Sequence, residues 1–177
     1  MKKLSMIFCL GLAFSFACQR EGSFPDVTSV PASENGETKE VPAGKLLAQV
    51  VFDSVVYIIP PEEMLQPFID EFADGTVVDK AMIKKVQAAK TDKPGYYLVG
   101  VGQKNGSSRM MAFQLYVAED NSLYITSSSR KHVTTSTSCA FCLFTFSKNM
   151  VSGAQCEDSG KDLDCTYTTS DYNKFML

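Results

Sequence analysis

The stretch "GYYLVGVGQKNGSSRMMAFQLYV", residues 95–117, carries the clearest structural pattern in the chain. On both sides of "QKNGSS" apolar residues recur at every second position, which is the spacing of strands that bury one face. Asn105 and Gly106 both tolerate positive φ, and Asn-Gly is the strongest short signal for a hairpin turn. The stretch therefore predicts an antiparallel hairpin, with apolar faces formed by Tyr97, Val99 and Val101 and by Met111, Phe113, Leu115 and Val117.

The residues after this hairpin extend it into a meander. "EDNS" (119–122) is rich in turn-forming residues and leads into "LYIT" (123–126), which predicts a third short strand. Residues 126–138 consist mainly of Ser and Thr and offer little for a core. They predict either a solvated linker or an exposed edge strand.

Helical patterns precede the hairpin. Residues 61–75 place apolar side chains at helical spacing, and a break at Gln66 lets Pro67 open a second short helix without a steric clash. Residues 79–90, "DKAMIKKVQAAK", repeat the spacing after a possible Asp79 cap and predict a further helix. The apolar positions of these predicted helices are Met64, Leu65, Phe68, Ile69, Phe72, Met82, Val86 and Ala89.

The segment from Lys45 to Pro60 is dense in Val and Ile. Its β-branched content favours a strand, although a helix fits the apolar count almost as well. Residues 45–137 are therefore expected to form one α+β domain, with an N-terminal helical region packed on an antiparallel β-meander.

Four of the six cysteines lie in the segment 138–177, spaced as Cys139-x2-Cys142-x13-Cys156-x8-Cys165. Zinc sites commonly use two close pairs of thiolates; the first pair fits this rule and the second is too widely spaced. A redox role for the first pair would need a strand-to-helix turn in a βαβ unit, but the sequence that follows, "LFTF", reads as a strand. Two disulfides are therefore favoured, in a tail packed on the same domain. Three pairings stay open, and a metal or thiol centre is the alternative.

The compartment supports disulfides. Lys2 and Lys3 precede an apolar run from Leu4 to about Phe16, and small residues then lead up to Cys18. This is the organisation of a bacterial secretory signal over residues 1–17, and it is too short for a membrane-spanning helix. Exported proteins occupy oxidising compartments in which paired thiols form bridges.

Cys18 is a predicted lipidation site. "SFAC" (15–18) is similar to a lipobox, in which the cysteine after the cleaved bond is acylated, but Ser15 replaces the usual Leu. Ordinary secretion is the alternative, because Ser15 and Ala17 also fit the small-x-small cleavage rule. Cysteine parity favours lipidation, since acylating Cys18 leaves an even set of four thiols after Cys9 departs with the signal.

Residues 18–44 are expected to be an acylated cysteine followed by a flexible tether, because they are rich in Pro, Gly, Ser and Glu. Removing residues 1–17 takes away two lysines and no acids, so the formal net charge moves from −3 to −5. An acidic product has no electrostatic reason to bind nucleic acid. The expected membrane contact is the lipid on Cys18, because no later apolar run reaches spanning length.

A resemblance covers residues 96–169. The shared pattern is a Tyr-Leu-x-Gly strand, an alternating strand ending in Asn-x-Leu-Tyr, and then Cys-x-x-Cys-x-Phe, Gly-x-x-Cys and a last cysteine. This pattern resembles a group of small, uncharacterised exported bacterial proteins and lipoproteins. The resemblance implies a secreted domain with a cysteine-rich tail and implies no activity.

Other candidate residues are weaker. His132 is the only histidine; no Gly-x-Ser-x-Gly elbow accompanies it, so a solvated histidine in a polar linker is expected. The remaining carboxylates are expected to be solvated, and the tyrosines to pack in the sheet rather than form a ligand strip. These residues are Glu62, Glu63, Asp70, Glu71, Asp74, Asp158, Asp162, Asp164, Tyr96, Tyr97 and Tyr116.

Taken together, the sequence predicts a lipid-anchored protein of the bacterial cell envelope, on the periplasmic or the cell-surface side. Its expected role is non-enzymatic, in binding or structure, with no cofactor and an unidentified protein or small-molecule ligand. The alternative is a periplasmic factor that uses Cys139, Cys142, Cys156 and Cys165 for metal or thiol chemistry, with His132 as a further candidate ligand.

Overall fold

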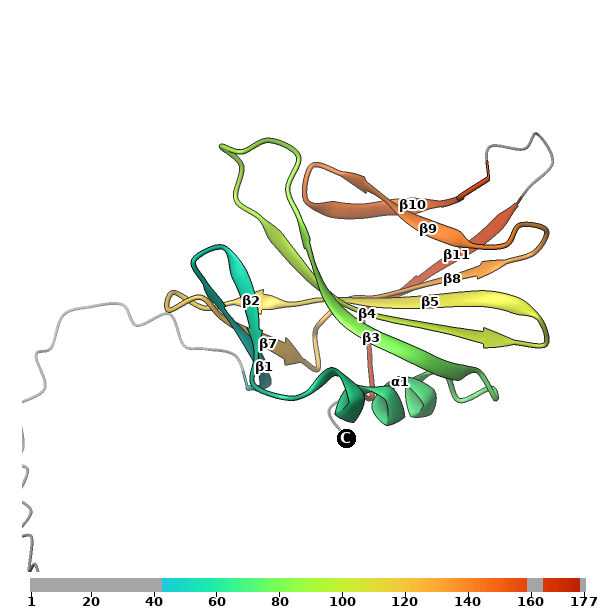
Figure 1. Cartoon of the computed structure of the whole chain (residues 1–177), viewed down its shortest axis with the longest axis horizontal. Coiled ribbons are helices and arrows are strands. Elements are labelled where there is room, and N and C mark those ends of the chain that lie inside the picture. The colour runs from blue at the N-terminus through green and yellow to red at the C-terminus, as the bar shows by residue number, and fades with distance from the viewer. Residues whose placement is uncertain (1–42, 159–163, 176–177) are drawn as a thin grey trace, which may run out of the picture. The chain divides into compact units, whose positions relative to one another are not determined.

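The computed structural model describes residues 43–158 and 164–175. The predicted signal, the lipidation site Cys18 and the tether up to residue 42 lie outside the described residues, as does Asp162. The described part is a β-rich domain of eleven strands and a short helical segment (Figure 1).

The hairpin predicted around Asn105 and Gly106 is confirmed. Strand β4 (Gly95–Lys104) pairs through its residues 97–104 with the whole of β5 (Ser107–Gln114). The two turn residues have φ values of 50° and 79°, as a tight hairpin turn requires. This hairpin lies inside a five-stranded antiparallel sheet of order β11-β8-β5-β4-β3, completed by β3 (Val77–Val86), β8 (Lys131–Ser136) and β11 (Cys165–Ser170).

Strand β4 is buried on both faces of this sheet. Tyr96 and Leu98 point into one apolar cluster, whereas Tyr97 and Val99 point into another on the opposite face. Successive side chains of β4 therefore point alternately into two different cores, and neither face of this part of the strand is turned to solvent. The prediction that Tyr96 and Tyr97 serve packing is confirmed.

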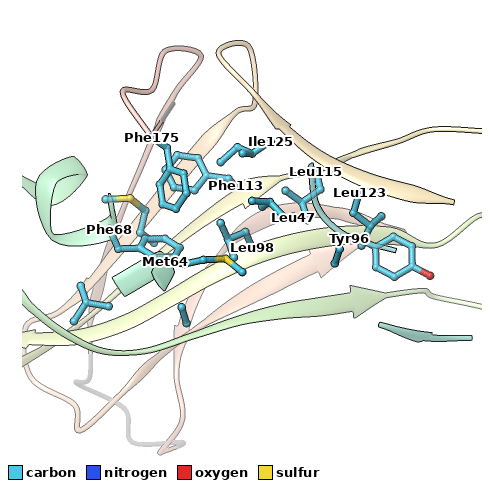
Figure 2. Close-up of a cluster of buried hydrophobic side chains, with 14 of the residues drawn as sticks. Leu47, Met64, Phe68, Tyr96, Leu98, Phe113, Leu115, Leu123, Ile125 and Phe175 are labelled. Carbon is cyan, nitrogen blue, oxygen red and sulfur yellow. The ribbon is translucent and has the colours of Figure 1, made fainter. Parts of the chain in front are cut away.

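The first core lies between the five-stranded sheet, the helical segment and a second sheet of order β2-β1-β7-β6 (Figure 2). In Figure 2, Phe68, Phe113 and Phe175 lie together, near Leu98. The strands of the second sheet are β1 (Gly44–Val51), β2 (Ser54–Tyr57), β6 (Tyr116–Val117) and β7 (Ser122–Thr126).

The second core lies under the hairpin of β9 (Cys142–Ser147) and β10 (Met150–Cys156), which forms a sheet of its own. Phe144 of β9 packs with Tyr97 and Val99, and Phe146 is packed against the same cluster. Among the described strands, β9 and β10 form a backbone ladder only with each other, and the Tyr97 hydroxyl of β4 joins the hairpin to the main sheet by donating to Asn149 O at 3.0 Å and accepting from Val151 N–H at 3.3 Å.

The predicted α+β fold class is wrong, because the described chain is mostly β. Its helical residues are confined to a 3₁₀ turn (Pro61–Met64) followed by α1 (Leu65–Phe72). Pro67 lies in the first turn of α1, where its missing N–H has no intrahelical partner to lose. The break that Pro67 requires falls between Met64 and Leu65 rather than at Gln66.

The helix predicted over 79–90 is mainly strand β3. β4 is buried, so the N–H and C=O groups on its outer edge need partners, and β3 supplies them through nine register pairs from Val77 to Val86. A register shift between Val78 and Lys80 offsets the side chains on β3. The predicted helical face is explained by the period of the strand itself: Met82 and Val86 are four positions apart, which places them on one face of a strand as well as on one face of a helix, and both pack in the second core.

Two further expectations are corrected. Residues 123–126 form β7, which pairs with β1 and β6 instead of continuing the meander beside β5. Residues 131–136 form β8, which lies between β5 and β11, so this segment is neither a linker nor an edge strand. The strand predicted over 45–60 is confirmed as two strands, β1 and β2.

The C-terminal residues fasten the two sheets to the helix. Asn173 is buried and donates hydrogen bonds to the carbonyl oxygens of Thr126, Ser127 and Ser129 at 3.0, 3.1 and 2.8 Å. The ring of Phe175 then packs against Phe68, with ring centroids 5.0 Å apart.

Candidate functional site

The four late cysteines meet at one end of the main sheet. Cys142 begins β9, Cys156 ends β10 and Cys165 begins β11, while Cys139 lies in the loop before β9. The structure pairs Cys139 with Cys156 and Cys142 with Cys165, with Cα–Cα distances of 5.9 and 5.8 Å. These distances suit disulfides, so the disulfide prediction is confirmed and one of the three pairings is selected.

The two bridges lie against each other. Cys139 Sγ is 3.6 Å from Cys142 Sγ and 3.7 Å from Cys165 Sγ, and Cys156 Sγ is 3.6 Å from Cys165 Sγ. All four sulfur atoms lie within 4.8 Å of one another. Cys142 is the most deeply buried of the four, at 1 % exposure.

The bridges attach the β9–β10 hairpin to the main sheet. The Cys142–Cys165 bridge joins β9 directly to β11, and the Cys139–Cys156 bridge joins the end of β10 to the loop that follows β8. Backbone bonds support the same corner: Thr137 N–H donates to Asp164 O, and Glu157 N–H donates to Phe141 O. The cysteines therefore hold the cover of the second core in place.

The same arrangement has a second chemical possibility. Four thiolates at a zinc–sulfur distance of about 2.3 Å would form a tetrahedron with edges of about 3.8 Å. The three distances of 3.6 to 3.7 Å between the two bridges already match such edges. A metal could be bound only after both bridges are reduced, because a bonded sulfur offers no thiolate.

His132 is a core residue and not a solvated one, so that prediction is wrong. It lies on β8 with 4 % of its surface exposed, and its Nδ1 is 2.8 Å from the Tyr167 hydroxyl. The Tyr167 ring stacks on the imidazole, and Tyr97 and Phe144 meet it edge-on. His132 therefore fills an aromatic pocket of the second core.

Burial lowers the pKa of His132 to about 4, with a smaller contribution from the positive charge of Arg130 that Asp171 partly opposes. The unfolded state, with a pKa near 6.5, binds the proton first. The stabilisation is therefore complete above about pH 7 and is lost as the pH falls through 6.5 towards 4. We expect a loss of about 3 kcal/mol in the free energy of unfolding from this residue.

The measurement is urea unfolding of the wild type and of His132→Phe between about pH 7 and about pH 4. His132→Phe keeps an aromatic ring but cannot titrate, whereas the carboxylates titrate in both proteins. The difference between the two proteins in how the free energy of unfolding changes with pH is therefore the contribution of His132. Equal pH dependence in the two proteins would show that folding does not change the pKa of the imidazole.

The predicted carboxylates divide into two groups. Glu62, Glu63 and Asp70 are exposed, as expected for the solvated face of a helix. The side chain of Glu71 is 2 % exposed, and its Oε1 accepts a hydrogen bond from Lys131 Nζ at 2.6 Å. The expectation that Glu71 is solvated is wrong.

Glu71 and Asp74 instead tie the helix to the sheets. Glu71 Oε2 accepts a hydrogen bond from the Lys174 backbone N–H at 2.6 Å. Asp74 pairs with Arg109, whose guanidinium also lies 4.9 Å from the Phe72 ring centroid. These pairs are structural, and no acid–base site follows from them.

Two polar cavities flank the segment that joins β5 to β6. They have volumes of about 460 and 360 Å³ and share Gln114, Leu115 and Tyr116 as walls. Arg130 and Asp171 line the larger cavity and form an ion pair with an Nε–Oδ1 distance of 2.7 Å. The cavities could admit a small polar molecule, but the two charged groups of the larger one, Arg130 and Asp171, are already paired with each other.

No known protein family, curated protein or solved structure matches the chain. The resemblance of residues 96–169 to exported bacterial proteins therefore stays a prediction. In the described ranges, no helix is long and apolar enough to cross a membrane.

The structure brings together all four predicted cysteines, and it also places His132 against Tyr97 in the second core. Asp158 and Asp164 are exposed and belong to no metal-binding cluster among the described residues. Sequence reasoning missed the pairing of Lys131 with Glu71 and the burial of His132. The signal for His132 was "HVTT", whose β-branched residues alternate as a strand would.

Proposed function

We propose that the chain is a lipoprotein of the bacterial cell envelope. After removal of residues 1–17, acylated Cys18 anchors the β domain, which provides a non-enzymatic binding or structural surface. The observation that supports this proposal best is the pair of disulfides in the described domain. Stable disulfides are typical of proteins outside the reducing cytosol, which is where the N-terminal signal would send the chain.

The anchor is tested by metabolic labelling with a palmitate analogue. The wild type is expected to carry label, and Cys18→Ser is expected to lose essentially all of it, because this cysteine is the predicted acylation site. Cys9→Ser is the matched control, because Cys9 leaves with the signal and its replacement keeps the label. A wild type without label would be a soluble secreted protein.

A second candidate function uses the cysteines for metal or thiol chemistry in the same compartment. It is favoured by the clustering of the four sulfur atoms within 4.8 Å. Thiol counting on folded, unreduced protein separates the two candidates. Bridges give no reactive thiols at these four positions, whereas a zinc site gives releasable metal and thiols that alkylate after chelation.

A further inference from the structure

The β1–β2 hairpin exposes an aromatic residue at its tip. Phe52 is 99 % exposed and has a φ of 47°, and the following Asp53 has a φ of 66°. Asn and Gly are the residues that such a turn favours, so a Phe there costs stability. A bulky apolar residue that is both strained and fully exposed contributes nothing to the folded domain by itself.

The outer side of the same hairpin carries further exposed apolar residues, together with the polar Gln49 and Ser54. Val55 and Tyr57 pack against the first core, whereas Val56 and Ile58 alternate with them and are about half exposed. An antiparallel hairpin at the border of a sheet ordinarily turns polar residues towards water. Exposed apolar residues on the solvent side (Val51, Val56 and Ile58), close to the fully exposed Phe52, are typical of a surface that binds a partner or a membrane.

Lysines gather beside this tip. Lys85 pairs with Asp53 across 2.5 Å, and Lys84 lies over the Phe146 ring at the end of β9. The β9–β10 turn touches the β3–β4 loop through a hydrogen bond from Asn149 Nδ2 to Lys93 O at 3.2 Å. Figure 1 shows the β1–β2, β3–β4 and β9–β10 turns on one side of the domain.

The charge at this end is slightly positive. Its lysines are Lys84, Lys85, Lys90, Lys93 and Lys148, and its acids are Asp53, Asp92, Glu119 and Asp120. The full chain is acidic, with a formal net charge of −3, so the cations are concentrated here relative to the rest. Apolar residues flanked by lysines suit the interface of a lipid bilayer, where the aromatic ring enters and the ammonium groups stay among the headgroups.

We propose that the β1–β2 tip docks on a lipid bilayer and inserts Phe52 into its interface. This inference rests on the proposed function, because the bilayer in question is the one to which acylated Cys18 would anchor the chain. A fully extended chain of the 24 residues from 19 to 42 would reach at most about 80 Å. The eight residues of β1 are about 26 Å long, so the anchor and the tip can reach one bilayer together.

The shape of the tip favours a membrane over another protein. A stable protein interface needs about 800 Å² of fitted surface from each partner. A projecting turn with one aromatic ring offers much less, but a fluid bilayer adapts to it. Self-association through this hairpin is nevertheless a distinct outcome of the test.

The test exploits the absence of tryptophan from the chain. Phe52→Trp places a single reporter at the tip, and Val77→Trp places the control at a residue that is 67 % exposed at the opposite end of β3 from Lys85. The mature proteins, which lack residues 1–17, are mixed with phosphatidylcholine–phosphatidylglycerol vesicles. We expect the Phe52→Trp emission to shift to the blue and to be quenched by brominated acyl chains, and the Val77→Trp emission to do neither.

Vesicle affinity of the unacylated mature chain provides the second readout, and it does not depend on the anchor. Phe52→Ser is expected to weaken binding about tenfold, while Val77→Ser leaves it unchanged. Lys93→Glu is also expected to weaken vesicle binding, with the likewise exposed Lys80→Glu as the matched control.

Equal emission from the two tryptophan variants on vesicles would overturn the proposal. A dimer in solution that is lost in Phe52→Ser would also overturn it, in favour of self-association. Failure of palmitate labelling affects only the anchor, because binding of the unacylated chain is measured separately.

Discussion

Replacing Cys139, Cys142, Cys156 and Cys165 by alanine is expected to lower the free energy of unfolding by about 6 kcal/mol. The two bridges close loops with sequence separations of 17 and 23 residues, and each such loop contributes about 3 kcal/mol by restricting the unfolded chain. The free energy of unfolding of a domain is about 5–15 kcal/mol in total, so losing both bridges would remove much of the stability of this domain.

The measurement is urea unfolding of the quadruple variant and of the two paired variants, Cys139→Ala/Cys156→Ala and Cys142→Ala/Cys165→Ala. Each paired variant is expected to lose about half of the free energy of unfolding that the quadruple variant loses. Hydrogen exchange should increase most in β9 and β10, because among the described strands they form a backbone ladder only with each other. A quadruple variant as stable as the wild type, together with reactive thiols in the unreduced protein, would contradict the bridges.

Phe68→Ala is expected to lower the free energy of unfolding by about 4 kcal/mol. The ring is fully buried and lies with its centroid 5.7 Å from Phe113 and 5.0 Å from Phe175. Its removal leaves a cavity where the helix, β5 and the C-terminal residues meet. Val77→Ala is the matched control and should change stability little, because Val77 is exposed.

A double-mutant cycle with Gly100 tests the same contact more sharply. A Cβ at Gly100 would lie 2.6 Å from the Phe68 ring, so Gly100→Ala alone is expected to cost about 2 kcal/mol. In the Phe68→Ala background the added methyl group has room, and the cost should nearly vanish. Additive losses in the double variant would show that the ring does not rest on Gly100.

The hairpin at Asn105 and Gly106 could be predicted because its information is local. The turn dipeptide fixes the register, and the alternating apolar residues lie directly beside it. Strand β3 could not be predicted in the same way. Its conformation depends on the hydrogen bonds that β4 requires, and those partners are brought together only by the sheet.

Strand β8 was missed for a related reason. Its inward positions carry His132, Thr134 and Ser136, which read as surface residues in sequence. Each is satisfied by a distant partner; for example, Thr134 Oγ1 donates to Thr166 O at 2.9 Å. Polar residues become core residues once such partners are present, and sequence spacing alone does not reveal them.

The sequence predicted which four cysteines form the bridges, but not which of them are bonded to each other. Export and even parity pointed to two bridges, and the structure contains two. The choice of partners depends on how the β9–β10 hairpin folds over β11, which is tertiary information. The neighbouring sulfur atoms that support the metal alternative could not be inferred from the spacing either.

The contact of Phe175 with Phe68 has a consequence for biogenesis. The nearby hydrogen bond from Lys174 to Glu71 joins residues 103 positions apart, so this corner of the domain closes only when the chain has emerged beyond it. A nascent polypeptide delivered N-terminus first would keep an open gap beside its helix throughout elongation. If the chain is exported as proposed, such delayed closure would leave the precursor open enough to pass through a translocation pore, and this corner would form only on the far side.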